Sequence, residues 1–265
     1  LLARAQEAAP VNLECLKGIV TMGSPFDKAS CDYYQRLFTS NIFNGYGTTE
    51  TFWNTFLRPW DLPEKAGSAG QSCVDDEVRI VRTSRDGGFA DPDELVARDN
   101  KEIGEIIIKT PAKSAYCYVK NTENSRKKFS GGYHYTGDLG VWDEKGFITV
   151  ISRKDDMIIS SGENIYPAQI EAVLNSHPKV NECAVVGKPN KRHGEIVLAY
   201  ISPASEDLTV AELKEYCAEH PMLPAFKRPR QYRFIKSLPR TATGKILRRE
   251  LRELARSEAE EENSI

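Results

Sequence analysis

The sequence has no long apolar run and almost no excess of charge of either sign. No apolar stretch approaches the roughly 20 residues that a membrane-spanning helix needs, so we expect no membrane span. A formal net charge of -2 gives no reason to expect nucleic acid or an anionic membrane surface as a partner. Neither end of the chain has the pattern of a secretion signal or a peroxisomal address, and we expect a cytoplasmic protein.

Closely spaced cysteines are also absent. The six cysteines are scattered, with no Cys-x-x-Cys pair and no histidine at metal-ligand spacing, which argues against a zinc site or a disulfide framework. We therefore expect reduced, buried thiols. The cysteines are Cys15, Cys31, Cys73, Cys117, Cys183 and Cys217.

The composition is that of an ordinary globular protein. With 265 residues, 40% of them hydrophobic and 28% charged, the chain is long enough for about two domains with real cores. It opens on Leu1 rather than methionine, in a helical pattern that begins in mid-course. We expect a truncated or trimmed chain.

The first stretch predicts a strand, a helix and a second strand. Apolar residues over Leu16–Met22 precede a helical pattern from Phe26 to about Phe38, and another short run ends at Asn44–Gly47. This order favours a parallel pair of strands. The loops after them, Gly23–Pro25 and Asn44–Glu50, would then emerge at the carboxyl edge, where open α/β sheets hold ligands.

From Gly67 to Arg153, short alternating strands and glycine-rich turns predict a small β-barrel-like layer. A hairpin of Leu139–Trp142 and Phe147–Ser152 would place Asp138 near Arg153.

After Asp156 the pattern predicts a separate α+β unit. Pro167 suits a first helical position, and Thr209 with Glu212 forms a capping-box pattern. The acidic segment Glu258–Glu262 is typical of a solvated tail. Strands are expected over Glu182–Val186, Ile196–Ile201 and Tyr232–Ile235.

The segment YGTTE, Tyr46 to Glu50, is the first candidate for chemistry. Gly47 and the preceding Gly45 would let the backbone approach a ligand, the two threonine hydroxyls could donate to phosphate, and Glu50 could hold Mg²⁺. The alternative is a polar turn between a strand and a helix.

Asp138, Arg153 and Lys245 are further candidates. A carboxylate in the glycine turn Thr136–Asp138 can accept hydrogen bonds from ribose hydroxyls, although such an Asp is often a local cap. Arg153 could equally be a surface arginine. Lys245 follows Thr243-Gly244; a mobile ammonium there could bridge a carboxylate and a phosphate in a transition state, or simply be exposed to solvent.

Together these segments resemble the adenylate-forming superfamily, which comprises acyl- and aryl-CoA synthetases, adenylation domains of peptide synthetases, and luciferases. The resemblance rests on LKGIVTMGSPF, NGYGTTE, YHYTGDLG, ISRKDDMIISSGENIYPAQIE and PRTATGKILRREL, which occur in the family's order over nearly the whole chain.

The resemblance implies a role for each motif. Asn44 and Tyr46 would meet the adenine, Thr49 the phosphates and Glu50 Mg²⁺, while Asp138 and Arg153 would hold the ribose. Lys245 would be the catalytic lysine. The implied nucleotide-binding set is Gly23, Ser24, Pro25, Asn44, Gly45, Tyr46, Gly47, Thr48, Thr49, Asp138 and Arg153.

It also implies domain alternation. Residues 1–154 would be the C-terminal part of a large domain, with a β-α-β layer over 1–62 and a barrel-like layer over 63–154. Residues 155–265 would form a small mobile lid that turns about Asp155. One orientation would bring Lys245 to the acid and ATP, and the other would present the loop Ser160–Asn164, with Ser161, Gly162 and Glu163, to the pantetheine of CoA.

The implied activity is that of an AMP-forming carboxylate–CoA ligase. A carboxylic acid and ATP give acyl-AMP and pyrophosphate, and acyl-AMP and CoA then give acyl-CoA and AMP. The family's phosphate loop does not occur in these residues, so we expect the chain to need a missing N-terminal part and to be inactive alone. Ser152 and Ser161 also stand where many relatives have glycine.

Two alternatives stay open. The chain could belong to an adenylation domain that loads a carrier protein, or it could be a non-catalytic nucleotide-binding remnant. The acid itself, aliphatic or aromatic, and the oligomeric state are not determined by these residues.

Overall fold

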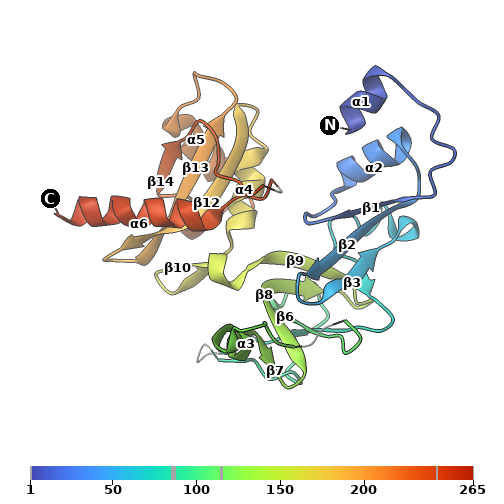
Figure 1. The fold of residues 1–265 in the computed structure, drawn as a ribbon. Helices are drawn as coiled ribbons and strands as arrows, with labels where there is room; N and C mark the ends of the chain where they lie inside the picture. Colours follow the sequence, from blue (N-terminus) through green and yellow to red (C-terminus); the bar gives the residue numbers. More distant parts are fainter. Residues whose placement is uncertain (1, 85–87, 114–115, 243, 265) are drawn as a thin grey trace. The chain divides into compact units, whose positions relative to one another are not determined.

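A computed structural model describes residues 2–84, 88–113, 116–242 and 244–264 (Figure 1). It divides into two compact units, Leu1–Ile151 and Ser152–Ile265. Each unit has buried apolar clusters of its own. The predicted domain boundary between residues 154 and 155 stays a prediction. So does the predicted boundary between the two layers of the first domain at residue 62. Within the described residues, no helix has the length and apolar character needed to cross a bilayer.

The first sheet of unit 1 has the order β1-β2-β3-β4, and β1 and β2 run parallel. The predicted strand–helix–strand order is therefore confirmed, with α2 as the crossover helix. Asp27 caps α2 by accepting from the Ser30 amide at 2.9 Å. The elements are α1 (Leu2–Ala8), β1 (Ile19–Met22), α2 (Lys28–Leu37), β2 (Ile42–Thr48), β3 (Phe52–Leu57), the 3₁₀ turn η1 (Pro59–Asp61) and β4 (Gln71–Ser72).

One expectation about this sheet is wrong. Asn44 to Thr48 do not form a loop, because they continue β2 and pair antiparallel with β3. A Cβ at Gly47 would lie 1.6 Å from the Phe52 carbonyl oxygen. Glycine at this position therefore permits a tight hairpin, rather than only a close approach to a ligand.

The second sheet of unit 1 has the order β5-β6-β8-β7, with β9 paired to β8. Its β-branched residues favour extended backbone and fill two buried clusters, as the barrel-like prediction required. The β8–β9 hairpin forms as predicted, closed by the Asp143 amide donating to the Phe147 carbonyl at 3.1 Å. The elements are β5 (Glu77–Val81), β6 (Gly104–Lys109), α3 (Thr122–Lys128), β7 (Phe129–Ser130), β8 (Tyr133–Trp142) and β9 (Ile148–Arg153).

Unit 2 is the predicted α+β unit, built on a sheet of order β11-β10-β13-β12, with β14 parallel to β13. Pro167 begins α4, as expected. The elements are the 3₁₀ turn η2 (Lys154–Asp156), β10 (Ile158–Ser160), β11 (Glu163–Ile165), α4 (Pro167–Asn175), β12 (Val180–Asn190), β13 (Gly194–Pro203), α5 (Val210–Glu219), the 3₁₀ turn η3 (Ala225–Lys227), β14 (Gln231–Phe234) and α6 (Arg248–Ser264).

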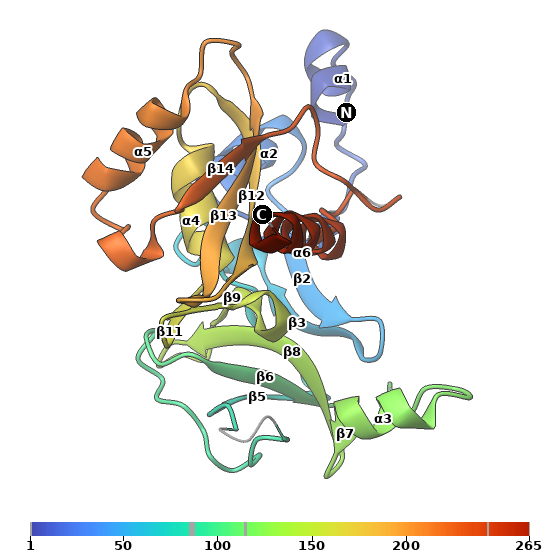
Figure 2. The ribbon, with the colours of Figure 1, turned by 90° about the vertical axis from the view of Figure 1, so that its left-hand side faces the viewer.

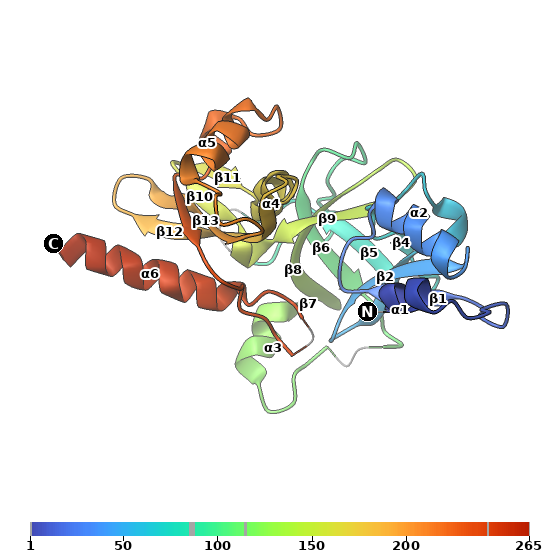
Figure 3. The same cartoon turned by 90° about the horizontal axis from the view of Figure 1, so that it is seen from above.

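Period-two alternation on β12 and β13 divides the core of unit 2 between the two faces of the sheet. Val185 and Val197 pack with the apolar stripes of α4 and α5, whereas Val186 and Leu198 pack against α6. Figures 2 and 3 show α4 and α5 on one face of the sheet and α6 on the other. Both faces are therefore covered by helices.

Two minor expectations hold only in part. The acidic end of α6 is exposed at residues 260–262, but it is anchored as well, because Glu258 and Glu262 form ion pairs with the buried Lys188. The cysteines are not all buried, because Cys15 and Cys117 are exposed. Spacing along the chain did not indicate either feature, since both depend on which distant segment lies opposite.

Candidate functional site

Strand β2 places Asn44, Tyr46 and Thr48 at alternate positions, so they share one face. Asn44 is buried and its amide nitrogen donates to the Ser24 carbonyl at 3.4 Å. The Thr21 hydroxyl, on the neighbouring strand β1, donates to the Asn44 amide oxygen at 3.1 Å. The Gly23–Pro25 loop and the β2 motif therefore meet, as expected for the carboxyl ends of parallel strands.

Tyr46 joins the two sheets of unit 1. Its hydroxyl donates to the Asp138 Oδ2 atom at 2.7 Å, although the residues lie 92 positions apart. The sequence predicts Asp138 in a turn, and this expectation is wrong, because Asp138 lies inside β8. The β6–β8 register shifts opposite Gly137, which has a φ of 74°, and such bulges redirect the neighbouring side chain. Asp138 is thereby held close to the β2 motif.

Glu50 lies in the turn after β2, where the Tyr118 hydroxyl donates to its Oε1 atom at 2.5 Å. Burial raises the pKa of Glu50, but the hydrogen bonds from Tyr118, from the backbone and from Thr48 and the charge of His134 outweigh it, and the net pKa is lowered. Burial and the bond to Glu50 raise the pKa of Tyr118 to about 12. Glu50 is therefore an ionised carboxylate in a half-buried site.

Sequence reasoning missed Tyr118 and His134. His134 is buried, and its Nδ1 atom lies 3.4 Å from the Thr48 hydroxyl. It belongs to the YHYTGDLG segment, four positions before Asp138, so that segment contained a signal for it. No local pattern indicated Tyr118, because its contact with Glu50 spans 68 positions.

The site fits Mg²⁺ only if a substrate supplies further oxygen ligands beside the Glu50 carboxylate. Across the described residues, no group of three or more His, Cys, Asp or Glu side chains could hold a metal ion. Mg²⁺ commonly takes one or two carboxylates and completes its shell with phosphate oxygens and water. The single ionised carboxylate of Glu50 is compatible with an ion that is brought in by a nucleotide.

The other predicted residues belong to unit 2. Lys245 is exposed on a loop between β14 and α6. There its amide donates to the Thr241 hydroxyl at 3.1 Å, and its carbonyl accepts from the Thr241 amide at 2.8 Å. These bonds fix the backbone of the loop and leave the side chain at the surface. Thr243 lies outside the described residues.

Ser161 occupies the turn between β10 and β11 with a φ of 53°. This left-handed conformation favours glycine, the residue expected from the resemblance. Two bonds to His193 support it: the Ser161 hydroxyl lies 2.7 Å from Nδ1, and the Ser161 amide donates to the His193 carbonyl at 2.8 Å. Of the remaining predicted residues in this unit, Arg153, Asp155, Gly162 and Glu163 are exposed.

The structure therefore brings together part of the predicted set. The residues of this part all lie in unit 1: β2 carries Asn44 and Tyr46, which contact Ser24 and Asp138, and Glu50 lies in the turn that follows β2. Arg153 and Lys245 belong to unit 2, and their approach to the unit 1 residues remains a prediction.

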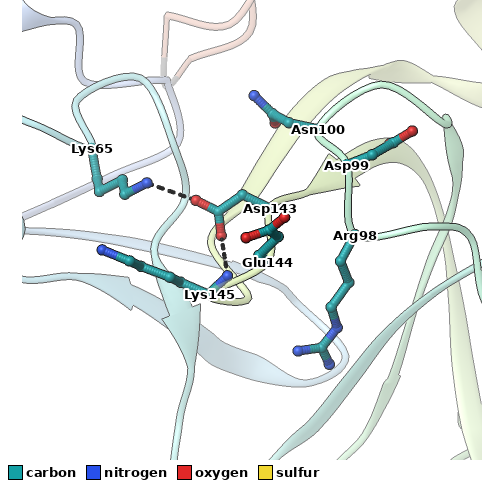
Figure 4. Close-up of a pocket in the computed structure, with 7 residues that line it drawn as sticks. All are labelled: Lys65, Arg98, Asp99, Asn100, Asp143, Glu144 and Lys145. Atoms are coloured by element: carbon teal, nitrogen blue, oxygen red, sulfur yellow. Dashed lines mark hydrogen bonds and ion pairs between the residues drawn. The ribbon is translucent and has the colours of Figure 1, made fainter.

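A separate pocket of about 290 Å³ lies at the turn of the β8–β9 hairpin (Figure 4). Its lining is charged except for Asn100, and Lys65 Nζ lies 2.7 Å from the Asp143 Oδ2 atom. None of the predicted site residues lines it. The lining residues are Lys65, Arg98, Asp99, Asn100, Asp143, Glu144 and Lys145.

Comparison with protein-family models gives two matches. Residues 1–118 match a family described as AMP-binding enzyme, and residues 169–245 match the AMP-binding enzyme C-terminal domain. Among curated proteins, the chain is 38% identical over 215 residues to a 2-succinylbenzoate–CoA ligase of Geobacillus sp. (strain WCH70), covering 80% of this chain and 41% of that protein. It is 35% identical over 257 residues to an uncharacterized acyl–CoA ligase of Bacillus subtilis (strain 168), covering 95% and 46%.

Solved structures give the same result. The o-succinylbenzoate CoA synthetase from Bacillus subtilis, in complex with its acyl-adenylate intermediate, matches with a TM-score of 0.78 and 34% identity over 94% of this chain and 49% of that chain. An anthranilate CoA ligase in complex with anthranoyl-AMP matches with a TM-score of 0.75 and 30% identity, over 94% and 46%. The chain thus spans about half the length of the relatives it matches.

Proposed function

The chain belongs to the AMP-binding enzyme family, and from this premise we propose that it is the C-terminal part of an AMP-forming carboxylate–CoA ligase. The intact protein converts a carboxylic acid and ATP to acyl-AMP and pyrophosphate. It then transfers the acyl group from AMP to the thiol of CoA. The observation that carries this proposal is the contact of Tyr46 with Asp138, which joins two of the nucleotide motifs in one unit.

The residues of unit 1 bind the nucleotide. Asn44, held by Thr21 and the Ser24 carbonyl, presents its amide to the adenine, and the Tyr46 ring lies beside it. Asp138 accepts from the ribose hydroxyls. Glu50 supplies the carboxylate for a Mg²⁺ ion, which neutralises phosphate charge when bound. Solved relatives are in complex with ATP and magnesium ion, and with AMP, which supports a nucleotide and Mg²⁺ as the ligands of the intact protein.

Unit 2 supplies the catalytic ammonium. The exposed side chain of Lys245 bridges the acid carboxylate and the α-phosphate, whose negative charges oppose their approach. Arg153 binds the ribose. Rotation about Asp155 then withdraws Lys245 and presents the Ser161–Glu163 turn to the pantetheine of CoA.

Aromatic carboxylic acids are the first substrates to test. A 2-succinylbenzoate–CoA ligase and an anthranilate CoA ligase are among the similar proteins, and both are named for aromatic acids. A pyrophosphate-release screen of the intact protein over aromatic and aliphatic acids identifies the class. Thioester formation measured with CoA and with a carrier protein then shows which of the two thiols accepts the acyl group.

The test of the catalytic role is Lys245→Ala in the intact protein. We expect pyrophosphate exchange to fall by about 10²–10³-fold, because one preorganised charge in a transition state is worth about that much. Thioester formation from preformed acyl-AMP should be largely retained. Lys236→Ala, at another exposed lysine of unit 2, is the matched control and should change neither step. Equal losses in both half-reactions would contradict the role.

A further inference from the structure

Two arginines of α6 lie one helical turn apart and face the same way. The first, Arg248, forms a bidentate pair with Glu171 of α4, with nitrogen–oxygen distances of 2.5 and 2.7 Å. It also donates to the Val185 carbonyl at 3.3 Å, and its Nε atom lies 3.7 Å from Asp156. Burial lowers the pKa of Arg248, but its bonds to Glu171 outweigh this and raise it, so the guanidinium stays charged.

The second arginine, Arg252, holds η2. Its Nη1 atom donates to the Asp155 carbonyl at 3.0 Å and forms an ion pair with the Asp156 carboxylate. The Asp156 side chain is only 14% exposed, so this pair is shielded from solvent more than most surface pairs. The backbone oxygen of one residue and the side chain of the next are thus both fixed to α6.

These contacts limit where the chain can turn. The two compact units divide between Ile151 and Ser152, so the end of β9 and then η2 are the first segments of unit 2. Because the Asp155 carbonyl and the Asp156 side chain are both held, the peptide plane between them moves with α6. Any rotation of unit 2 against the preceding chain must then occur about backbone bonds that come before the Asp155 carbonyl. These include the φ and ψ bonds of Asp155 itself.

We propose that Arg252, supported by Arg248, is a positioning residue. It fixes the end of the joint between the two units, namely η2 with Asp155 and Asp156, to α6. Lys245 lies three positions before Arg248, so the helix that anchors the joint also begins directly after the lysine loop. The joint and the lysine loop therefore move as one body, and a turn at Asp155 is transmitted to Lys245 rather than lost in a flexible segment. This consequence for catalysis rests on the proposed function, whereas the clamp itself does not.

Amide hydrogen exchange of the 265-residue chain tests the clamp. In Arg252→Gln we expect exchange over residues 152–158 to rise by about tenfold, since a charge-assisted bond is lost. The amide of Met157 is the most direct probe, because in the wild-type structure it donates to the Arg153 carbonyl at 3.2 Å. Arg249→Gln, on the exposed side of the same helix, is the matched control and should not change this segment.

Unchanged exchange over 152–158 in Arg252→Gln would overturn the proposal. So would an equal rise over β12 and β13, because Arg252 would then act on the stability of the whole unit. In the intact protein, Arg252→Gln should lower acyl-AMP formation by about tenfold, and Arg249→Gln should leave it unchanged. If the intact wild-type protein forms no acyl-AMP with any acid, the proposed function fails, while the exchange result still decides the clamp.

Discussion

Tyr46 and Asp138 illustrate how single contacts assemble this site. A phenol on β2 and a carboxylate on β8 come within 2.7 Å because a bulge at Gly137 redirects β8. Asp138 is 7% exposed, so its carboxylate depends on protein donors in place of water. The pair therefore both stabilises unit 1 and orients the group proposed to bind ribose.

Removing the Tyr46 hydroxyl tests the strength of this contact. We expect Tyr46→Phe to lower the free energy of unfolding by about 1–3 kcal/mol, because a buried carboxylate loses a donor. Urea unfolding of Tyr46→Phe, Asp138→Asn and the double variant gives the coupling energy of the pair. If the losses of the single variants simply add, the two groups do not interact in solution.

At the scale of elements, local signals in the sequence are borne out most directly in unit 2. Thr209 caps α5, with its hydroxyl accepting from the Glu212 amide at 3.2 Å. The apolar stripe of this helix, including Leu213 and Cys217, is buried against the sheet. The cap begins the helix at the point where the stripe can reach the core.

Thr209→Ala should therefore destabilise the chain by about 1 kcal/mol, the usual cost of losing an N-cap. Thr209→Ser retains the hydroxyl and should cost much less. Urea unfolding followed by circular dichroism of the helices measures both. Equal stabilities of the Ala and Ser variants would show that the cap contributes little.

At the scale of the whole molecule, the division into two units is the main feature. Unit 1 has two sheets joined through Tyr46, and unit 2 has one sheet covered on both faces. Neither Leu213 of unit 2 nor Ile107 of unit 1 shares a buried cluster with residues of the other unit. Each cluster therefore supports its own part of the fold.

A substitution that leaves a cavity in the core of one unit should consequently destabilise that unit and leave the other unit protected. Leu213→Ala should cost about 2–5 kcal/mol and raise exchange in β12 and β13, while β6 and β8 keep their protection. Ile107→Ala should have the opposite pattern. Amide hydrogen exchange resolved by peptide measures both variants, and a loss of protection throughout the chain in either one would contradict independent cores.

The sequence by itself determined what depends on neighbouring residues: the parallel β1–α2–β2 order, the cap at Thr209 and the motifs that identify the family. Only the tertiary structure decided that Tyr118 contacts Glu50, that Asp138 sits in a bulge, and that Arg252 holds the Asp155 carbonyl. The physical reason is range. Periodicity, capping and turn chemistry act over a few residues. The Tyr118–Glu50 and Arg252–Asp155 contacts instead join residues 68 and 97 positions apart, and the bulge forms between two separate strands. Whether such segments meet depends on how whole sheets and helices pack.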